Sequence, residues 1–174
     1  MKYNLRMKLI NLKLTDYRNC RNIEMDFSRD KILIIGKNAQ GKTNILESVY
    51  FLSTLKSPRT SNNIELINFD AEKLCIEADI IKADTEIGLG YIYTKEKTRE
   101  LKINGVKSRP KDFKSVLKTV LFSTSDLLLL RGNPSDRREW LDRAISQVYP
   151  AYDDRLSKYD KIRIQKNNFL KELV

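Results

Sequence analysis

Residues Lys31 to Thr43 read K-I-L-I-I-G-K-N-A-Q-G-K-T, and the interpretation of the whole chain starts from this stretch. The apolar run at its beginning, rich in β-branched isoleucine, predicts a short buried strand over Lys31–Ile35. The eight residues that follow match the phosphate-loop pattern G-x-x-x-x-G-K-[ST] at every fixed position. Gly36 and Gly41 leave the backbone free to curl, so that successive N–H groups can face one anion.

The polar end of this loop and the segment behind it complete the expected phosphate site. Lys42 supplies a cation for the outer phosphates, and the hydroxyl of Thr43 is a ligand for Mg²⁺. Apolar residues recur at helical spacing over residues 44–52, so a helix N-terminus should point at the phosphates. We therefore predict nucleotide contacts from Gly36, Lys37, Asn38, Ala39, Gln40, Gly41, Lys42 and Thr43.

Composition narrows the class of protein and of partner. The 174 residues carry a net charge of +10, which points to a polyanionic partner; a soluble, highly charged surface is the alternative. The chain has two distant cysteines and no histidine, which excludes a Cys/His zinc site and a Cys–His nucleophile. Free thiols and the lack of any apolar run of about 18 residues predict a cytoplasmic protein without a membrane span.

Alternating apolar and polar residues predict further strands, and their order predicts an antiparallel meander. The expected strands are residues 7–14, 23–27, 74–81, 85–93 and 99–103. The last of these ends in Asn104-Gly105, a strong signal for a tight turn. A continuous apolar run predicts another buried strand over Thr119–Ser123, and short helices are expected at 64–69 and 110–118.

Three helices are expected in the C-terminal part. Ser125 is a candidate cap for a short helix over residues 127–130 that Gly132 ends, and Asn133 caps the next helix. The buried face of that helix is predicted to comprise Trp140, Leu141, Ala144, Ile145 and Val148. The last helix begins near Pro150 and has no stop signal before Val174, so we expect the chain to be the N-terminal part of a longer protein.

Basic residues gather around the predicted meander. Residues 95–118 include nine basic and three acidic side chains, a local charge of +6. This segment is the best candidate for contact with a nucleic-acid backbone; an exposed hairpin kept soluble by lysines is the alternative. The residues expected to contact DNA are Lys102, Lys107, Arg109 and Lys111.

A phosphate-loop ATPase normally needs a second acidic residue after an apolar strand, to hold Mg²⁺ and water. The candidates are Asp70, Asp79 and Asp126. Asp70 follows a helix-like stretch and Asp79 lies inside an amphipathic strand. Asp126 follows a suitable strand but begins a helix. We therefore expect the catalytic acid to lie beyond Val174.

Four segments resemble the RecF recombination mediators. They are G-K-N-A-Q-G-K-T-N-I-L-E-S-V-Y at 36–50, T-D-Y-R-N at 15–19, S-P-R-T at 57–60 and L-F-S-T-S-D-L-L-L-L-R-G-N-P-S-D-R-R-E-W-L-D at 121–142. The last is the most specific, because it is long and nucleotide binding in general does not explain it. The similarity runs from about Met7 to about Leu170, and Thr124-Ser125 stand where the family usually has Pro-Glu.

The resemblance implies an α/β fold, the ABC-type phosphate-loop ATPase head related to SMC-like chromosome proteins. Residues 1–124 would form the ATP-binding subdomain, a lobe I core with an antiparallel β meander at about 74–104. Residues 125–174 would begin a helical lobe. By the family pattern Arg18 would reach the nucleotide, and Asp126 would replace the coordinating glutamine of many relatives as a second metal ligand.

The resemblance also implies an activity and partners. Such heads bind Mg-ATP and form an ATP-dependent homodimer in which a signature motif closes over the partner's nucleotide. RecF-like proteins bind DNA at single-strand/duplex boundaries and work with RecR to help RecA load, in DNA repair, replication and the SOS response. The signature motif and the acidic strand have no match here, so we expect this chain to bind ATP without efficient hydrolysis. A small phosphate-loop kinase or a non-catalytic nucleotide-sensing module is the alternative.

Overall fold

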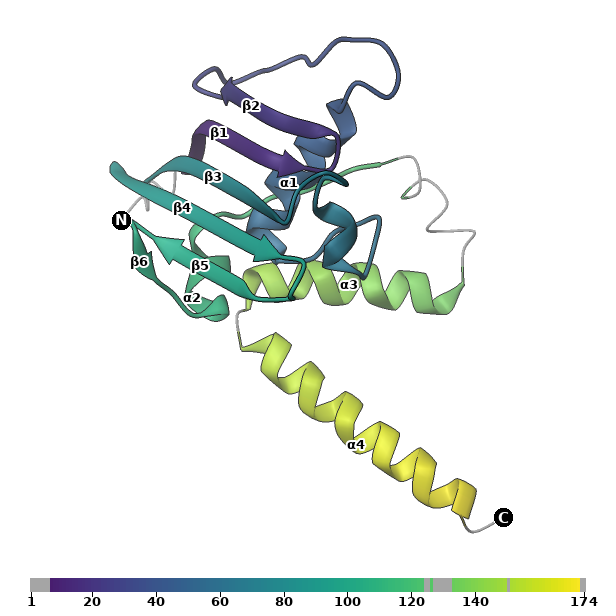
Figure 1. Cartoon of the computed structure of the whole chain (residues 1–174). Coiled ribbons are helices and arrows are strands. Elements are labelled where there is room, and N and C mark those ends of the chain that lie inside the picture. Colours follow the sequence, from purple (N-terminus) through teal and green to yellow (C-terminus); the bar gives the residue numbers. More distant parts are fainter. Residues whose placement is uncertain (1–6, 124–125, 127–132, 150, 173–174) are drawn as a thin grey trace. The chain divides into compact units, whose positions relative to one another are not determined.

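The computed structural model describes residues 7–123, 126, 133–149 and 151–172 of the chain. These residues fall into two compact units, 1–121 and 122–174, which are described separately (Figure 1). The first unit contains the phosphate loop and all the strands. The second contains two long helices.

The first unit is built on a six-stranded antiparallel sheet in the order β2-β1-β3-β4-β5-β6 (Figure 1). Its strands are β1 (Met7–Tyr17), β2 (Cys20–Asp26), β3 (Lys73–Lys82), β4 (Thr85–Thr94), β5 (Arg99–Ile103) and β6 (Val106–Lys107). The predicted meander is therefore present, with β1 and β2 extending the same sheet. At the predicted tight turn, Asn104 and Gly105 both have positive φ, 51° and 76°, as a two-residue hairpin turn requires.

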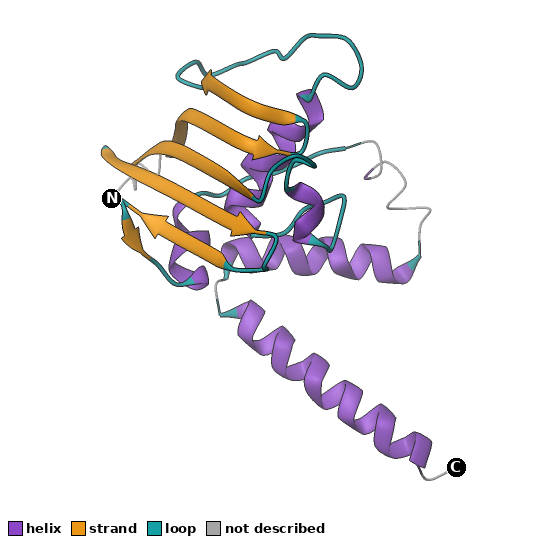
Figure 2. Ribbon diagram, in the orientation of Figure 1, coloured by secondary structure: helices purple, strands orange, loops and turns teal. Residues whose placement is uncertain are grey.

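One face of the sheet is covered by helices α1 (Lys42–Thr54) and α2 (Pro110–Val116), and the core lies between these layers (Figure 2). Alternate residues of the strands are buried there, for example Leu12 and Leu14 of β1. The ring of Phe51 in α1 meets that of Tyr91 in β4 edge-on, with centroids 4.8 Å apart. This packing fixes α1, and so its N-terminus, against the sheet.

A short 3₁₀ helix, η1 (Asn63–Leu66), takes the place of the longer helix predicted at 64–69. It lies against the β1–β2 turn, because the Arg18 N–H donates to Leu66 O and the Asn68 N–H donates to Asp16 O. The turn that follows β1 is therefore bound to a segment about fifty residues further along the chain.

Two predicted strands are not strands in the structure. Lys31–Ile35 and Thr119–Ser123 form neither strand nor helix and lie outside the sheet. Leu33 and Ile35 are 81% and 82% exposed, and Val120 is 98% exposed. An apolar run forms a strand only where another strand pairs with it. Among the described residues, no strand pairs with either run.

The second unit comprises α3 (Pro134–Val148) and α4 (Tyr152–Glu172). Asn133 precedes α3 as predicted, and its N–H donates to the carboxylate of Asp136. The predicted buried face of α3 is wrong, because Trp140, Leu141 and Val148 are 44%, 51% and 70% exposed. Two helices alone cannot enclose an apolar face. The predicted helix over 127–130, with Ser125 and Gly132 at its ends, lies outside the described residues.

Candidate nucleotide site

The phosphate loop is an exposed curl of backbone that leads directly into α1. Ala39 and Gly41 are left-handed, with φ of 65° and 92°, and of the eight loop residues Gly36–Thr43 only Gly41 is buried. A Cβ at Gly41 would lie 3.0 Å from Cys20 Sγ and 3.1 Å from Asn19 Oδ1. Glycine is required at this position by its backbone angle and by the close approach of the β1–β2 turn.

The loop carries the ammonium of Lys42, and the helix behind it begins with backbone N–H groups that no described side chain caps. The Nζ of Lys42 donates to the carbonyl oxygens of Gly36 and Lys37, each at 2.6 Å, so the ammonium bridges the loop. No described side chain caps the N-terminus of α1, and its first turn holds no acidic residue. The free N–H groups and the helix dipole therefore favour an anion at this end. Thr43 is exposed in the same turn.

The most buried charged group in this region is Glu47 of α1. Its side chain is 1% exposed, and among the described residues it is the only charged side chain that is buried. Arg18 donates to both carboxylate oxygens, from Nε at 2.6 Å and from Nη2 at 2.7 Å. Ser57 also donates to Glu47, and Arg59 Nη1 lies 3.3 Å from Oε2. Two arginines therefore share one carboxylate one turn into the helix that follows the loop.

These contacts shift the pKa values of Arg18 and Tyr17. The hydrogen bond to Glu47 raises the pKa of Arg18, which keeps the guanidinium charged. Burial, reinforced by the Glu47 carboxylate, raises the pKa of Tyr17. The cluster contains two arginines and one carboxylate, which leaves an excess of positive charge near the loop.

A chain of side-chain amides connects the loop to this cluster. Asn19 Nδ2 donates to the carbonyl of Ala39 at 2.8 Å, and Asn19 Oδ1 accepts from Asn44 Nδ2 at 2.7 Å. Asn44 Oδ1 in turn accepts from Arg59 Nη1 at 2.7 Å. Sequence reasoning assigned no role to Asn19, Asn44, Glu47 or Arg59. The sequence feature that could have indicated this cluster is Glu47, a carboxylate one helical turn before the apolar Phe51.

Arg18 and Asp126, the two predicted nucleotide-site residues outside the loop, each bond to another side chain or backbone group of the chain. The fork of Arg18 is directed at Glu47, and its predicted contact with nucleotide stays a prediction. Asp126 lies in the second unit, where its carboxylate accepts from the N–H and the hydroxyl of Ser123, each at 2.7 Å. Its role as a metal ligand also stays a prediction.

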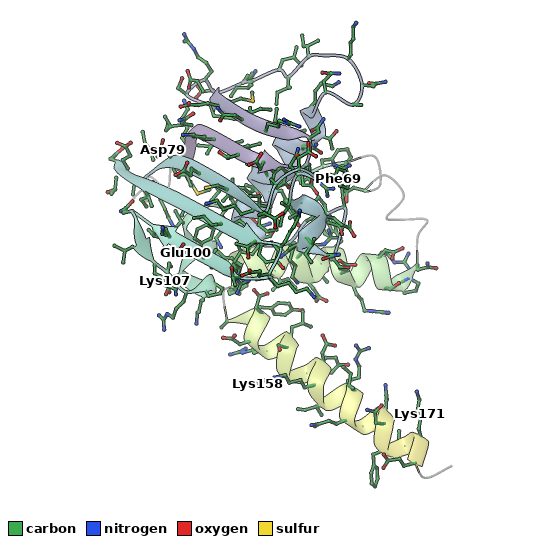
Figure 3. The ribbon with its side chains drawn as sticks, in the orientation of Figure 1. Phe69, Asp79, Glu100, Lys107, Lys158 and Lys171 are labelled. Atoms are coloured by element: carbon green, nitrogen blue, oxygen red, sulfur yellow. The ribbon has the colours of Figure 1, made fainter. Side chains whose placement is uncertain are left out.

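The predicted DNA-contacting residues lie around the edge of the sheet at β6. Lys102 and Lys107 are directly opposite each other in the register of β5 and β6. Figure 3 labels Lys107 and Glu100 at this edge, and Glu100 lies 3.4 Å from the ammonium of Lys102. Arg109 pairs with Asp112 at 2.9 Å. Lys111 is exposed in the first turn of α2. Lys102 and Lys107 are therefore neighbours, and two of the four residues, Lys102 and Arg109, already have acidic partners.

None of the helices in the described part of the chain is long and apolar enough to cross a membrane.

Comparison with known proteins identifies relatives of this arrangement. A family model described as "AAA ATPase domain" matches residues 7–172. The chain is 42% identical over 168 residues to the DNA replication and repair protein RecF of Bacillus subtilis (strain 168). It is 41% identical to RecF of Staphylococcus carnosus (strain TM300). Each alignment covers 96% of this chain but 45% of the relative, so the chain spans about half the length of these curated relatives.

Solved structures agree with the sequence comparison. A structure of the recombination mediator protein RecF-ATP in the RecFOR pathway matches with a TM-score of 0.88 and 31% identity, covering 99% of this chain and 47% of that one. A structure from work on ATP-driven dimerization of SMC ATPases matches with a TM-score of 0.66 at 16% identity, over 79% of this chain and 99% of that one. The second match shows a shared fold alone. The predicted ATPase-head fold is confirmed.

Proposed function

Because the chain belongs to the AAA ATPase domain family and is similar to RecF over nearly its whole length, we propose that it is the ATP-binding part of a DNA replication and repair protein. The observation that carries this proposal is the phosphate loop with Lys42 bridging it and the uncapped N-terminus of α1 behind it. This combination of an ammonium, free N–H donors and a helix dipole suits a chain of phosphates.

Each group at the loop is proposed to contact a different part of Mg-ATP. The backbone of Gly36–Thr43 would surround the phosphates, and the ammonium of Lys42 would exchange its two carbonyl partners for phosphate oxygens. Arg18 is proposed to extend this positive region from the β1–β2 turn, because Glu47 fixes its guanidinium beside the start of α1. The Thr43 hydroxyl, exposed in the first turn, would hold Mg²⁺, which when bound neutralises charge on the outer phosphates.

We propose that this chain alone turns ATP over slowly. Hydrolysis needs a positioned water and charge stabilisation at the transition state. Asp70 is engaged by Arg21 at 2.6 Å, and Asp79 lies in the middle of β3, where it pairs with Gly88. Neither is placed as a free acid beside the loop. The remaining groups would come from elsewhere in the whole protein, including a second copy in an ATP-dependent homodimer.

The proposed polymer partner is DNA, contacted through the basic edge around β6. Lys102 and Lys107 lie directly opposite each other, an arrangement of like charges that a phosphate backbone would relieve. We further propose, from the resemblance to RecF, that the whole protein acts in the cytoplasm at single-strand/duplex boundaries. There it would work with RecR and help RecA to load.

Titration of Mg-ATP into the chain and into a Lys42→Ala variant tests the ATP half of this proposal. The variant removes the ammonium that bridges the loop and leaves the backbone of the loop in place.

A further inference from the structure

Resting on the proposed nucleotide site, we propose that Asn19 is a positioning residue that holds the phosphate loop open for phosphates. It does so through two hydrogen bonds of one side-chain amide. Its Nδ2 donates to Ala39 O in the loop, and its Oδ1 accepts from Asn44 in α1. Asn19 lies on the β1–β2 turn, and its Oδ1 also accepts from the Sγ of the buried Cys20 at 3.5 Å. Its side chain bonds the proposed phosphate site through the backbone carbonyl of Ala39.

The bond to Ala39 fixes the orientation of one loop peptide. Ala39 is left-handed with φ of 65°, a conformation that residues other than glycine adopt with strain and keep only when their surroundings hold it. The described chain has no cis peptide bond, and in a trans peptide the carbonyl and the next N–H point in opposite directions. With Ala39 O held by Asn19, the Gln40 N–H points away from the Asn19 side chain.

The bond to Asn44 fixes the orientation of Asn19 itself. An amide has one accepting and one donating end, so acceptance from Asn44 Nδ2 by Oδ1 turns the Nδ2 of Asn19 toward Ala39. Asn44 is held in the same way, because its Oδ1 accepts from Arg59. These hydrogen bonds therefore connect the Ala39 peptide to α1, through Asn44, and to the loop containing residues 57–60, through Arg59.

Asn19 suits positioning better than general stabilisation. Its side chain is exposed, and the buried residue beside it is Cys20. Loss of an exposed amide removes little apolar burial, so the fold should tolerate it. The predicted consequence is a loop that samples other peptide orientations and binds phosphates less well.

The experiment compares the unsubstituted chain with Asn19→Ala, Asn44→Ala and the control Asn22→Ala. Asn22 is an exposed asparagine on the same β-hairpin, paired with Thr15. Mg-ATP affinity is measured by calorimetry, the apo melting temperature by circular dichroism, and the bound β-phosphate by its ³¹P chemical shift. We expect Asn19→Ala to weaken Mg-ATP binding by about tenfold, the scale of one hydrogen bond. We also expect it to displace the ³¹P resonance and to leave the apo melt close to that of Asn22→Ala.

Asn44→Ala should weaken Mg-ATP binding less than Asn19→Ala does. The double variant Asn19→Ala/Asn44→Ala should bind Mg-ATP as well as Asn19→Ala alone, because both substitutions act through the one contact with Ala39. Unchanged affinity and an unchanged ³¹P shift in Asn19→Ala would overturn the inference while leaving the proposed function standing. If Asn19→Ala melts lower, a displaced ³¹P resonance supports the inference and an undisplaced one overturns it. If it does not fold, Asn44→Ala decides by the same shift. Failure of the unsubstituted chain to bind Mg-ATP would overturn the proposed function and this inference together.

Discussion

The guanidinium of Arg18 donates to both carboxylate oxygens of Glu47, at 2.6 Å and 2.7 Å, although the two residues are 29 positions apart in the chain. This pair joins the β1–β2 turn to α1 within two turns of the phosphate loop. Because Glu47 is buried, the contact is shielded from water and holds the turn and the helix in one arrangement. In the sequence, the phosphate loop lies between the β1–β2 turn and the part of α1 that holds Glu47.

Removal of the Glu47 charge should destabilise the first unit. Glu47→Gln leaves Arg18 and Arg59 close together without their shared carboxylate, and we expect a loss of about 3 kcal/mol in the free energy of unfolding. Urea denaturation measures this. Glu77→Gln, an exposed change of the same kind on β3, should alter stability by less than about 0.5 kcal/mol. Equal stability of the two variants would show that the Glu47 cluster does not hold the fold together.

Tyr91 should limit stability at high pH. Its hydroxyl is buried without a hydrogen-bond partner among the described residues, and burial raises the pKa of Tyr91 above the ordinary value of about 10. Above about pH 10 the unfolded chain therefore loses this proton first, and stability falls as the pH rises. Tyr91→Phe should reduce that fall and should leave stability at pH 7 unchanged or higher by about 1 kcal/mol.

The control for this change is Tyr93→Phe, on the same strand and stacked on Tyr91 but half-buried. Chemical unfolding at pH 7 and between about pH 10 and 11 compares the three proteins. A Tyr91→Phe variant that loses as much stability at high pH as Tyr93→Phe does would contradict this account.

DNA binding through the β6 edge should depend steeply on salt and not on sequence. Replacement of both Lys102 and Lys107 by Gln should flatten the log–log salt slope on duplex DNA by up to about two units, at about 0.9 per phosphate contacted. Fluorescence anisotropy at several salt concentrations measures the slope. The matched control replaces Lys158 and Lys171 of α4 and removes the same charge elsewhere. Equal slopes in the two double variants would mean that the β6 lysines only keep the sheet edge soluble.

ATP turnover by this chain should be barely above background even at high protein concentration. The reason is that hydrolysis needs a group that positions water, whereas Asp70 is paired with Arg21 and Asp79 lies in the middle of β3. Phosphate release at saturating Mg-ATP checks this. Brisk release that Lys42→Ala abolishes would place a catalytic acid within these residues.

The accuracy of prediction from sequence differed by element. The meander and the Asn104-Gly105 turn could be predicted, because strand alternation and turn chemistry are local. The runs at Lys31–Ile35 and Thr119–Ser123 were predicted as buried strands, yet Leu33, Ile35 and Val120 are exposed. Pairing is non-local, and an apolar run does not specify its partner.

In the site too, features encoded by local sequence could be predicted and contacts between distant segments could not. The loop residues were identifiable because their chemistry requires fixed spacing. Glu47, Asn19 and Arg59 meet from three segments of the chain, and their contacts depend on how the β1–β2 turn packs on α1. No local pattern encodes that packing. The predicted nucleotide contact of Arg18 came from the resemblance, and its pairing with Glu47 is visible only in the structure.

The most direct test of the central claim is a calorimetric titration of Mg-ATP into the chain, the Lys42→Ala variant and a Lys56→Ala control. Lys56 is an exposed lysine just beyond α1, outside the loop. We predict saturable binding by the unsubstituted chain and by Lys56→Ala, and no measurable binding by Lys42→Ala, with all three apo proteins melting at similar temperatures. Retained Mg-ATP affinity in Lys42→Ala would contradict the assignment of Gly36–Thr43 as the phosphate site.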